Sequence, residues 1–331
     1  MNNDQLDFLA IGDIMTDAFI RIKEAHLNCS VNHEKCEICM DFGSKVPYES
    51  VTVIPAVGNS GNAAVCAARL GLKTAFLTDL GADRYGDEAI EALEKNRVLT
   101  NFVRKHEGIA TNYHYVLWYG DDRTILIKHE EYPYSLPNIG SPRWIYFSSL
   151  GENSLPYHEQ ILNYLNAHPE IKLAFQPGTF QMKLGSDKLS GFYKRSDVFF
   201  CNKQEAQKIL NNQSGEIKEL IAEMQKLGPK IVVITDGKDG AYAAADGKIW
   251  FMPPYPDPKP PLERTGAGDS FSSTFTAALA LGKSVPEALA WGPINSMSVV
   301  QYVGAQEGLL TREKLGGYLK TAPTSYAPQE I

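Results

Sequence analysis

The sequence predicts an α/β protein in which a mostly parallel β-sheet carries helices on both faces. Two observations support this. Short apolar runs rich in β-branched and aromatic residues alternate with helix-periodic stretches along most of the chain, and these runs have the composition of buried parallel strands. The chain has 331 residues, with 44% hydrophobic and 21% charged residues, which allows one large globular domain.

The predicted elements alternate along the chain. We expect strands at residues 8–12, 75–80, 144–148, 172–175, 198–201 and 231–235. We expect helices at residues 62–70, 83–96, 159–167, 204–210, 216–227 and 271–281. Ligands of such sheets bind beyond the carboxyl ends of the strands. Polar residues just past predicted strands are therefore candidate site positions, namely Asp13, Asp79, Gln176, Asn202 and Asp236.

Residues 18–55 and 109–128 depart from this alternation. The first segment has little helical periodicity, and the second shows β-type alternation around a turn signal at Gly120. We expect both to form a small β-sheet lid inserted in a single domain that spans residues 1–331. The lid aromatics close over a ligand or pack against a second subunit, and an exposed apolar lid face would predict a homodimer. We interpret His106, His114 and His129 as ordinary lid or surface residues.

Charge and composition exclude several classes of partner. The net charge is 32 − 39 = −7 without a long basic stretch, which argues against nucleic acid and anionic membranes. No secretory signal and no apolar run of about 20 residues is present, so a cytoplasmic location is expected. The odd number of five cysteines also fits a reducing compartment. Cys36 and Cys39, with Cys29 and His33 nearby, leave open either zinc binding or buried and free thiols.

The most informative segment is Thr265-Gly266-Ala267-Gly268-Asp269-Ser270, which precedes an apolar, helix-spaced run. The two glycines therefore lie at a helix N-terminus, where free backbone N–H groups and the helix dipole favour an anion. Asp269 falls in the first turn, beside that anion. A general base next to a transferring phosphoryl group needs a carboxylate there, although a tight turn gives the same spacing.

Three further segments are weaker when each is taken alone. Residues 57–64 bring glycines and amides into a helix, where Asn62 either caps the helix or binds a polar ligand. Glu205, three residues after Asn202, complements a helix dipole or holds hydrated Mg²⁺. Thr235-Asp236-Gly237 follows a predicted strand, and a simple turn into the next strand would account for it.

In their order along the chain, these segments resemble the ribokinase-like (PfkB) family of carbohydrate and nucleoside kinases. The resemblance extends from Phe8 to about Gly308 and implies a three-layer α/β/α fold. It implies that Asp269 is the catalytic base and that the N–H groups of Gly266, Ala267 and Gly268 face the γ-phosphate of ATP.

The same resemblance implies the remaining site residues. Asn202 and Glu205 match the motif associated with Mg²⁺ and phosphate, with Glu205 binding Mg²⁺ through water. Thr235 and Gly237 match the nucleotide-contacting turn, and Asn295 matches a position near the adenine. The acceptor-binding positions are Asp17, Gly58 and Asn62, with Asp13 as a weaker candidate.

Two positions depart from the family pattern. Glu263 stands where members often carry an aspartate that helps to bind a monovalent cation, and Arg264 adds a positive charge, so K⁺ activation is left open. Met15 replaces an asparagine of ribokinase, which argues against a ribose-specific site, although core packing also accounts for a methionine there.

Three functional classes follow from these residues. The first is an ATP-dependent kinase that phosphorylates a hydroxyl of a small sugar, and the second is a nucleoside kinase with the same chemistry. The third is a non-catalytic relative that binds a ligand. Asp269, both glycines and the Asn202/Glu205 pair are all present, which argues against the third class. The acceptor itself is not identified by the sequence.

Overall fold

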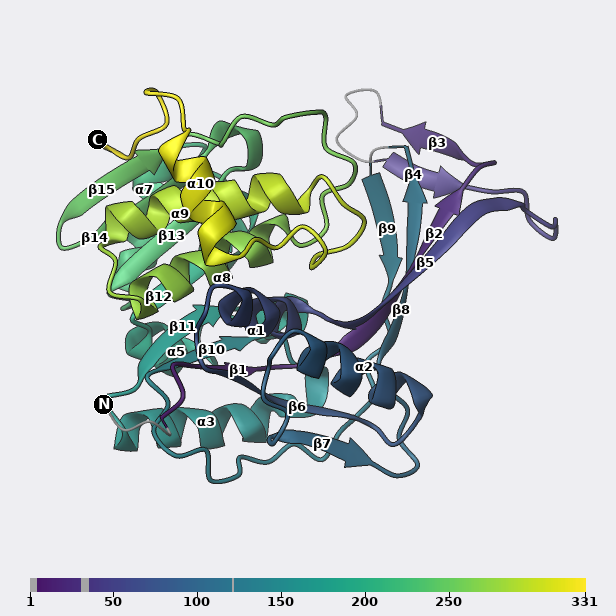
Figure 1. Cartoon of the computed structure of the whole chain (residues 1–331), viewed down its shortest axis with the longest axis horizontal. Coiled ribbons are helices and arrows are strands. Elements are labelled where there is room, and N and C mark those ends of the chain that lie inside the picture. The colour runs from purple at the N-terminus through teal and green to yellow at the C-terminus, as the bar shows by residue number, and fades with distance from the viewer. Residues whose placement is uncertain (1–4, 31–35, 121) are drawn as a thin grey trace.

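The computed structural model describes residues 5–30, 36–120 and 122–331, and within them it confirms the predicted fold class (Figure 1). The largest sheet has ten strands. Their spatial order is β16 (Gln329–Glu330), β15 (Lys248–Met252), β14 (Ala241–Ala245), β13 (Ile231–Thr235), β12 (Val198–Asn202), β11 (Lys172–Gln176), β10 (Trp144–Ser148), β1 (Phe8–Ile11), β6 (Thr74–Gly81) and β7 (Val103–His106).

The strands from β13 to β7 pair in parallel, and β14, β15 and β16 add an antiparallel edge. Neighbouring residues of one strand point to opposite faces of the sheet, as Phe8 and Leu9 do, and they belong to two separate cores. Both faces are therefore apolar, which explains why the strands lack polar alternation.

Helices cover both faces and complete the three layers. One core takes side chains from α1 (Asn59–Arg69), α2 (Arg84–Lys95), α8 (Ala267–Ala280), α9 (Val285–Val299) and α10 (Arg312–Lys320). The other takes them from α3 (Leu155–Ala167), α4 (Thr179–Leu184), α5 (Ser190–Arg195), α6 (Lys203–Leu210) and α7 (Ile217–Lys226). Short 3₁₀ turns occur at Glu152–Ser154 and Gly237–Asp239.

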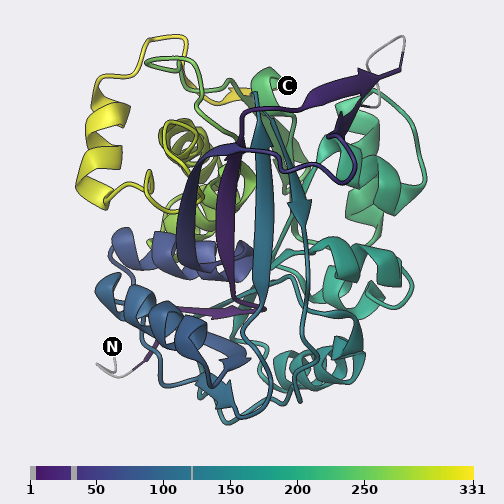
Figure 2. The same ribbon diagram turned by 90° about the vertical axis from the view of Figure 1, so that its right-hand side faces the viewer.

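A second sheet projects from the body and stands upright in Figure 2. It consists of β5 (Tyr48–Val57), β2 (Met15–Ile22), β8 (Tyr113–Tyr119) and β9 (Asp122–Leu126) in that order. The residues that face each other across its strands divide into two sets. The inner set is buried and includes Asp17, Phe19, His114, Val116 and Trp118, whereas the outer set is exposed and includes Val51, Val53, Tyr115 and Leu126.

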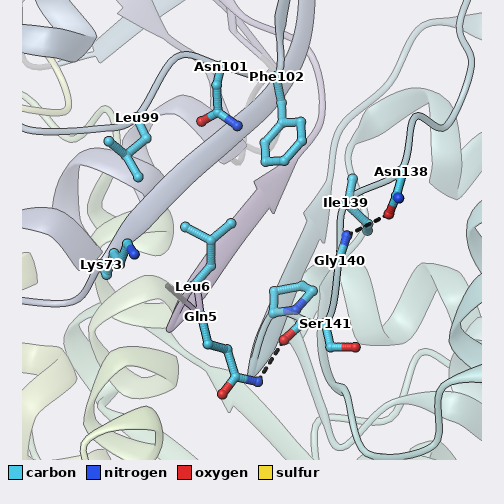
Figure 3. A pocket seen from close by; sticks show the side chains of 11 residues that line it. Gln5, Leu6, Lys73, Leu99, Asn101, Phe102, Asn138, Ile139, Gly140 and Ser141 are labelled. Carbon is cyan, nitrogen blue, oxygen red and sulfur yellow. Dashed lines mark hydrogen bonds between the residues drawn. The ribbon is translucent and has the colours of Figure 1, made fainter. Parts of the chain in front are cut away.

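A cavity of about 650 Å³ lies at the end of the main sheet opposite to the carboxyl ends of its parallel strands (Figure 3). Its lining residues, such as Leu6, Lys73, Phe102 and Ile139, come just before β1, β6, β7 and β10. It thus opens at the amino ends of the strands, whereas ligands of such sheets bind beyond the carboxyl ends. None of the predicted site residues lines it.

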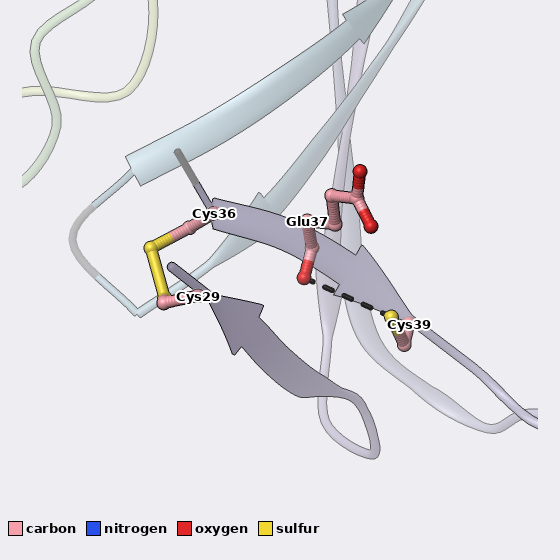
Figure 4. Close-up of a disulfide and its surroundings, with 4 residues drawn as sticks. All are labelled: Cys29, Cys36, Glu37 and Cys39. Atoms are coloured by element: carbon pink, nitrogen blue, oxygen red, sulfur yellow. Dashed lines mark hydrogen bonds between the residues drawn. A yellow bond between two sulfur atoms is a disulfide. The ribbon is translucent and has the colours of Figure 1, made fainter. Parts of the chain in front are cut away.

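Strands β3 (His26–Cys29) and β4 (Cys36–Cys39) form a separate hairpin beyond the second sheet. Cys29 and Cys36 are paired across it and form a disulfide (Figure 4). The interpretation of both as free or buried thiols is therefore wrong, and their sulfurs are not available to zinc. Cys39 remains a thiol, and His33 lies outside the described residues. A disulfide is more typical of oxidising compartments, so the cytoplasmic location stays a prediction.

Within the described ranges, no helix is long and apolar enough to cross a membrane.

Candidate active site

Helix α8 begins where the glycine-rich segment predicts an anion site. Its N-cap is Gly266, whose φ of 77° lies in the left-handed region that favours glycine. A Cβ at Gly266 would lie 2.2 Å from the Cβ of Ala305, so the close approach of that loop also requires glycine. A Cβ at Gly268 would meet nothing within 4 Å, because Gly268 faces open space. The first N–H groups of α8 lack partners inside the helix, and the Ala267 N–H has only a long contact of 3.5 Å with the Arg264 carbonyl.

A pocket of about 280 Å³ adjoins this helix end. Four of the predicted nucleotide-site and anion-site residues line it together: Thr235 at the end of β13, Gly237 in the turn that follows, and Ala267 and Gly268 from α8. Its other walls include Tyr255, Phe271, Met297 and Val300, and its charged groups are Lys238, Arg264 and Asp257. Apolar walls beside free N–H groups and an arginine suit a nucleotide, which has an apolar base and anionic phosphates.

Asp269 lies one residue further along α8 and is held by two side-chain amides. Nδ2 of Asn62 donates to Oδ2 of Asp269 at 2.9 Å, and Nε2 of Gln176 donates to Oδ1 at 3.1 Å. Asn62 comes from α1 and Gln176 from the carboxyl end of β11. Asn62 lies inside α1, whose N-cap is Gly58, so the alternative that Asn62 caps the helix is wrong.

Neighbouring groups fix the orientation of both amides. Oδ1 of Asn62 accepts from Nε2 of Gln306 at 3.1 Å, which leaves its NH₂ group for Asp269. Oε1 of Gln176 accepts from the hydroxyls of Tyr146 and Ser272, which directs its NH₂ group in the same way. Each Asp269 oxygen therefore has one fixed donor and keeps a lone pair for a proton.

Burial raises the pKa of Asp269, and the hydrogen bonds from Asn62 and Gln176 oppose that rise. Burial disfavours the charged carboxylate, whereas donors stabilise it. A carboxylate with a raised pKa is a stronger base, so this environment suits proton abstraction from an alcohol.

Asn202 and Glu205 form a capping box at the start of α6. Oδ1 of Asn202 accepts from the Glu205 N–H at 2.8 Å, and Oε2 of Glu205 accepts from the Asn202 N–H at 2.9 Å. Burial raises the pKa of Glu205, and the negative charge of Asp269 adds to the rise, so the two carboxylates lie within electrostatic reach. The next residue, Lys203, forms an ion pair with Asp236 at 3.1 Å. Glu205 thus lies in the first turn of α6, as the helix-dipole alternative expects, and the capping box uses only one of its two oxygens.

Asp17 lies on the inner face of the second sheet. Its side chain is buried, and its Oδ1 has no hydrogen-bond partner. Burial raises the pKa of Asp17 to about 7, and the negative charges of Glu263 and Asp269 add to the rise. Gly58, with a φ of 104°, lies against Met15, because a Cβ at Gly58 would be 2.8 Å from its terminal methyl group. Met15 is 6% exposed and thus packs in the core beside this site.

Two predicted site residues do not face these groups. Asp13 is fully buried, and its oxygens accept from the hydroxyl of Tyr134 at 2.8 Å and contact Nδ1 of His129 at 2.9 Å. Asn295 is also fully buried. Its side-chain NH₂ donates to Thr274 and its side-chain oxygen accepts from the N–H of Leu310, and its helix reaches the pocket through Pro293, Ser296 and Met297 instead.

Glu263 connects the anion-site loop to the loop after α9. Its Oε2 accepts from the N–H of Thr265 at 2.6 Å, and its Oε1 accepts from the N–H of Gly304 at 2.8 Å. Gly304 in turn lies against the second sheet, because a Cβ there would be 2.2 Å from Cδ1 of Ile54. The buried carboxylate thus has two donors of its own, and it holds the start of α8 in place relative to the second sheet.

The structure adds residues that the sequence did not assign to the site. Gln176 was a candidate only by its place after a strand, and Gln306 carried no motif at all. Among the described residues, no group of three His, Cys, Asp or Glu side chains could hold a metal ion. Mg²⁺ keeps several waters and binds substrate phosphates, so a single nearby carboxylate such as Glu205 is a compatible donor set.

The fold and the site together define a phosphotransferase of the α/β class: a free helix N-terminus, a pocket beside it and a held carboxylate. The family model described as pfkB family carbohydrate kinase matches residues 24–312. The chain belongs to this family, and it is a sugar or nucleoside kinase of the ribokinase type.

Individual relatives agree with this assignment. Ribokinase of Bacillus subtilis (strain 168) is 27% identical over 282 residues, covering 82% of this chain and 90% of that protein. The 5-dehydro-2-deoxygluconokinase of the same strain is 26% identical over 306 residues, covering 84% and 92%. The structure of Arabidopsis thaliana ribokinase with ribose and ATP superposes with a TM-score of 0.79 at 21% identity, covering 96% of this chain and 99% of that chain.

Proposed function

We propose that this protein transfers the γ-phosphate of ATP to a hydroxyl of a small sugar, with Asp269 as the general base. The observation that carries the proposal is the position of Asp269, held by Asn62 and Gln176 within one turn of the free N-terminus of α8. A base and an anion site must lie this close for an alcohol to attack a bound phosphate.

Asp269 takes the proton of the attacking hydroxyl, and its raised pKa favours that transfer. The N–H groups of Gly266, Ala267 and Gly268 stabilise the charge of the transferring phosphate, and such preorganised donors are each worth about 10²–10³ in rate. Thr235 and Gly237 hold the nucleotide in the adjoining pocket.

When bound with ATP, Mg²⁺ supplies positive charge to the phosphates. Glu205 would hold one of the waters of Mg²⁺, and two observations support this proposal: one Glu205 oxygen is outside the capping box, and its charge lies near that of Asp269. The N–H groups of Thr265 and Gly304 donate to Glu263 and stabilise its negative charge without removing it. K⁺ activation therefore stays an open prediction.

Asp17, Gly58 and Asn62 form the acceptor side of the site. Asp17 offers a buried oxygen without a hydrogen-bond partner, and Gly58 lies close against Met15, where a Cβ would clash. Asp13 is not assigned to the acceptor, because Tyr134 and His129 occupy its oxygens. The second sheet, built from residues 15–22, 48–57, 113–119 and 122–126, acts as the lid that excludes water from the reaction.

Purified protein should consume ATP only when a suitable alcohol is present, and a panel of sugars, gluconate derivatives and nucleosides tests this. We expect turnover with at least one sugar, and loss of turnover when EDTA removes Mg²⁺. The absence of turnover with every acceptor would reject the kinase proposal. A preference for nucleosides would show that the acceptor is a nucleoside instead of a sugar, with the same phosphoryl transfer. An unchanged rate in EDTA would contradict the proposal that Glu205 acts through Mg²⁺.

We also propose that the outer face of the lid forms a homodimer. Val51, Val53, Tyr115 and Leu126 are between 44% and 52% exposed, and they adjoin one another through the strand pairing. Contiguous exposed apolar patches of this kind mark interaction surfaces.

Val53→Lys should therefore shift the protein from dimer to monomer in analytical ultracentrifugation, because it places a charge inside the apolar interface. Leu99→Lys, at an exposed leucine beside the opposite cavity, is the matched control and should leave the mass unchanged. A monomeric unaltered protein, or a Val53→Lys dimer of unchanged affinity, would contradict the proposed interface.

A further inference from the structure

Gln306 lies in the loop after α9 and joins the end of β5 to Asp269 through a chain of amides. Its side chain is 7% exposed, and its Nε2 donates to the carbonyl oxygen of Ala56 at 2.7 Å and to Oδ1 of Asn62 at 3.1 Å. Nδ2 of Asn62 then donates to Oδ2 of Asp269 at 2.9 Å. Gln306 thus reaches the carboxylate through Asn62.

The carbonyl of Ala56 fixes the direction of every hydrogen bond in this chain. A backbone carbonyl only accepts, so Gln306 must present its NH₂ group to it. The second N–H of that group faces Asn62, which must therefore present its oxygen. The NH₂ group of Asn62 is then left for Asp269. Without this reference, the Asn62 amide could turn and offer its oxygen to the carboxylate, which would remove a donor.

The backbone at Ala56 is unusual. Its φ of 61° lies in the left-handed region, which non-glycine residues rarely adopt. In the pairing of β5 with β2, Pro55 and Ala56 together oppose the single residue Thr16, so β5 has a bulge here. A bulge redirects the backbone of its strand, and here the redirected carbonyl meets the side chain of Gln306. Strained backbone of this kind persists where the surroundings hold it and is typical of functional sites.

The loop that carries Gln306 is tied to the helices beside it. Arg69, in the last turn of α1, donates from Nη1 to the carbonyl oxygens of Gln306 at 2.6 Å and of Leu309 at 3.0 Å. Oγ of Ser298 in α9 donates to the carbonyl oxygen of Gly308 at 2.7 Å. These bonds leave Gln306 little freedom to turn away, so its donors are held in place before any substrate binds.

The second donor of Asp269 is directed by hydroxyls instead of by the backbone. Oε1 of Gln176 accepts from the hydroxyls of Tyr146 and Ser272. A hydroxyl can turn and either donate or accept, whereas a backbone carbonyl can only accept. The direction of the Asn62 bond is therefore set more firmly than that of the Gln176 bond, and Gln306 is the residue that sets it.

We propose that Gln306 is a positioning residue for phosphoryl transfer: acting through Asn62, it keeps a hydrogen-bond donor on Asp269 and so holds this carboxylate in the ionised form that accepts the hydroxyl proton. The inference rests on the proposed function and adds a residue that lies outside the nucleotide pocket. The hydrogen bond from Asn62 lowers the pKa of Asp269 against the effect of burial, in agreement with this role.

Other charged groups near the chain stay in place when Gln306 is replaced. Arg69 contacts the backbone carbonyl of Gln306 and not its side chain. Among the described residues, the charge of Asp269 acts on the titratable side chains of β2, α6 and β10, namely Asp17, Glu205 and Tyr146. A change in the pH dependence on replacing Gln306 therefore reports the amide chain.

The test compares pH profiles of kcat/KM for the best acceptor of the panel. The rate rises with pH as Asp269 loses its proton, so the acid side of the profile reports the pKa of this carboxylate. Gln306→Met removes the donors and frees the Asn62 amide, and it should move the acid side to higher pH by about half a unit or more. Gln306→Glu places an acceptor beside Asn62 and turns its oxygen toward Asp269, so the shift should be about one unit or more. Above the acid side, both variants should recover most of the rate, because the base itself remains.

Gln301→Met is the matched control. Gln301 is another buried glutamine in the loop after α9, but its Nε2 donates to the Lys259 carbonyl at 3.2 Å. Its variant should keep the unaltered pH profile. In Asn62→Ala the chain is already broken, so adding Gln306→Met should shift the acid side no further. A merely structural role of Gln306 would lower the melting temperature without moving the pH profile.

The two Gln306 variants predict a shift in the same direction, so either one that folds decides the question. An acid side that does not move in Gln306→Met or Gln306→Glu would overturn this inference alone and leave the kinase proposal in place. An equal shift by Gln306→Met with and without the Asn62 side chain would also overturn it, since Gln306 would then act by another route. No turnover of any acceptor by the unaltered protein would overturn the kinase proposal and this inference with it.

Discussion

Asp269→Asn is expected to lower kcat by about 10²–10⁴, because asparagine keeps the shape of the side chain but cannot take a proton. The two amides that hold Asp269 position either side chain, so the KM for ATP should change little. Steady-state phosphorylation of the best acceptor measures both constants. Asp246→Asn, at an exposed turn between β14 and β15, is the matched control and should keep full activity.

The same substitution should preserve the fold. The folded-state pKa of Asp269 is raised, so the folded protein holds that proton more tightly than the unfolded chain does. The stabilising contribution is therefore present at low pH and is lost as the pH rises through the folded pKa. At neutral pH, the asparagine removes a buried negative charge, which is stabilising. Its own NH₂ group then faces the NH₂ group of Asn62 or of Gln176, which is destabilising because both are donors. These effects oppose each other, so the melting temperature should change by only a few degrees. Full activity in Asp269→Asn would exclude this carboxylate as the base.

The sequence was sufficient for the features that depend on local pattern. Residues 144–148 and 231–235 were predicted as strands with the bounds that the structure has, because buried parallel strands are short, apolar and β-branched. The start of α8 was also predictable, since glycine is a favoured N-cap residue and the run that follows has helical spacing. The roles of the site residues stay predictions, although the structure brings Thr235, Gly237, Ala267 and Gly268 into one pocket.

Contacts between distant segments could not be predicted in the same way. Asn62 and Asp269 are separated by 207 positions and Asn62 and Gln306 by 244, and no periodicity encodes such pairs. The adenine position of Asn295 rested on resemblance alone, and a rotation about the axis of α9 buries that residue while its neighbour Ser296 lines the pocket. Cys29 and Cys36 needed the hairpin register before their disulfide could be foreseen.

The two glycines of the anion site should respond oppositely to alanine. Gly266→Ala places a Cβ 2.2 Å from that of Ala305 and forces a left-handed backbone on a non-glycine residue. Together these effects should lower the free energy of unfolding by about 2–4 kcal/mol. Gly268→Ala meets no atom within 4 Å and lies in the first turn of a helix, where alanine stabilises by about 0.5–1 kcal/mol.

Activity should not follow stability in this pair. Gly268 lines the pocket proposed to take the phosphate, so the added methyl group of Gly268→Ala should lower kcat/KM for ATP by about 10²-fold despite a higher melting temperature. Gly316→Ala in α10 makes the same change in open space away from the site, and it should stabilise without any loss of activity.

Gly282→Ala measures the cost of backbone strain without a steric clash like that of Gly266→Ala with Ala305. Gly282 has a φ of 83°, but a Cβ there meets nothing within 4 Å. The substitution should destabilise by about 1–2 kcal/mol and leave kcat unchanged. Thermal unfolding measures the stability of all four glycine variants, and steady-state kinetics measures their activity. If Gly268→Ala were stabilised and fully active, the N–H groups at this helix end would not bind the transferring phosphate. If Gly266→Ala lost no more stability than Gly282→Ala, contact with Ala305 would not be what fixes the start of α8.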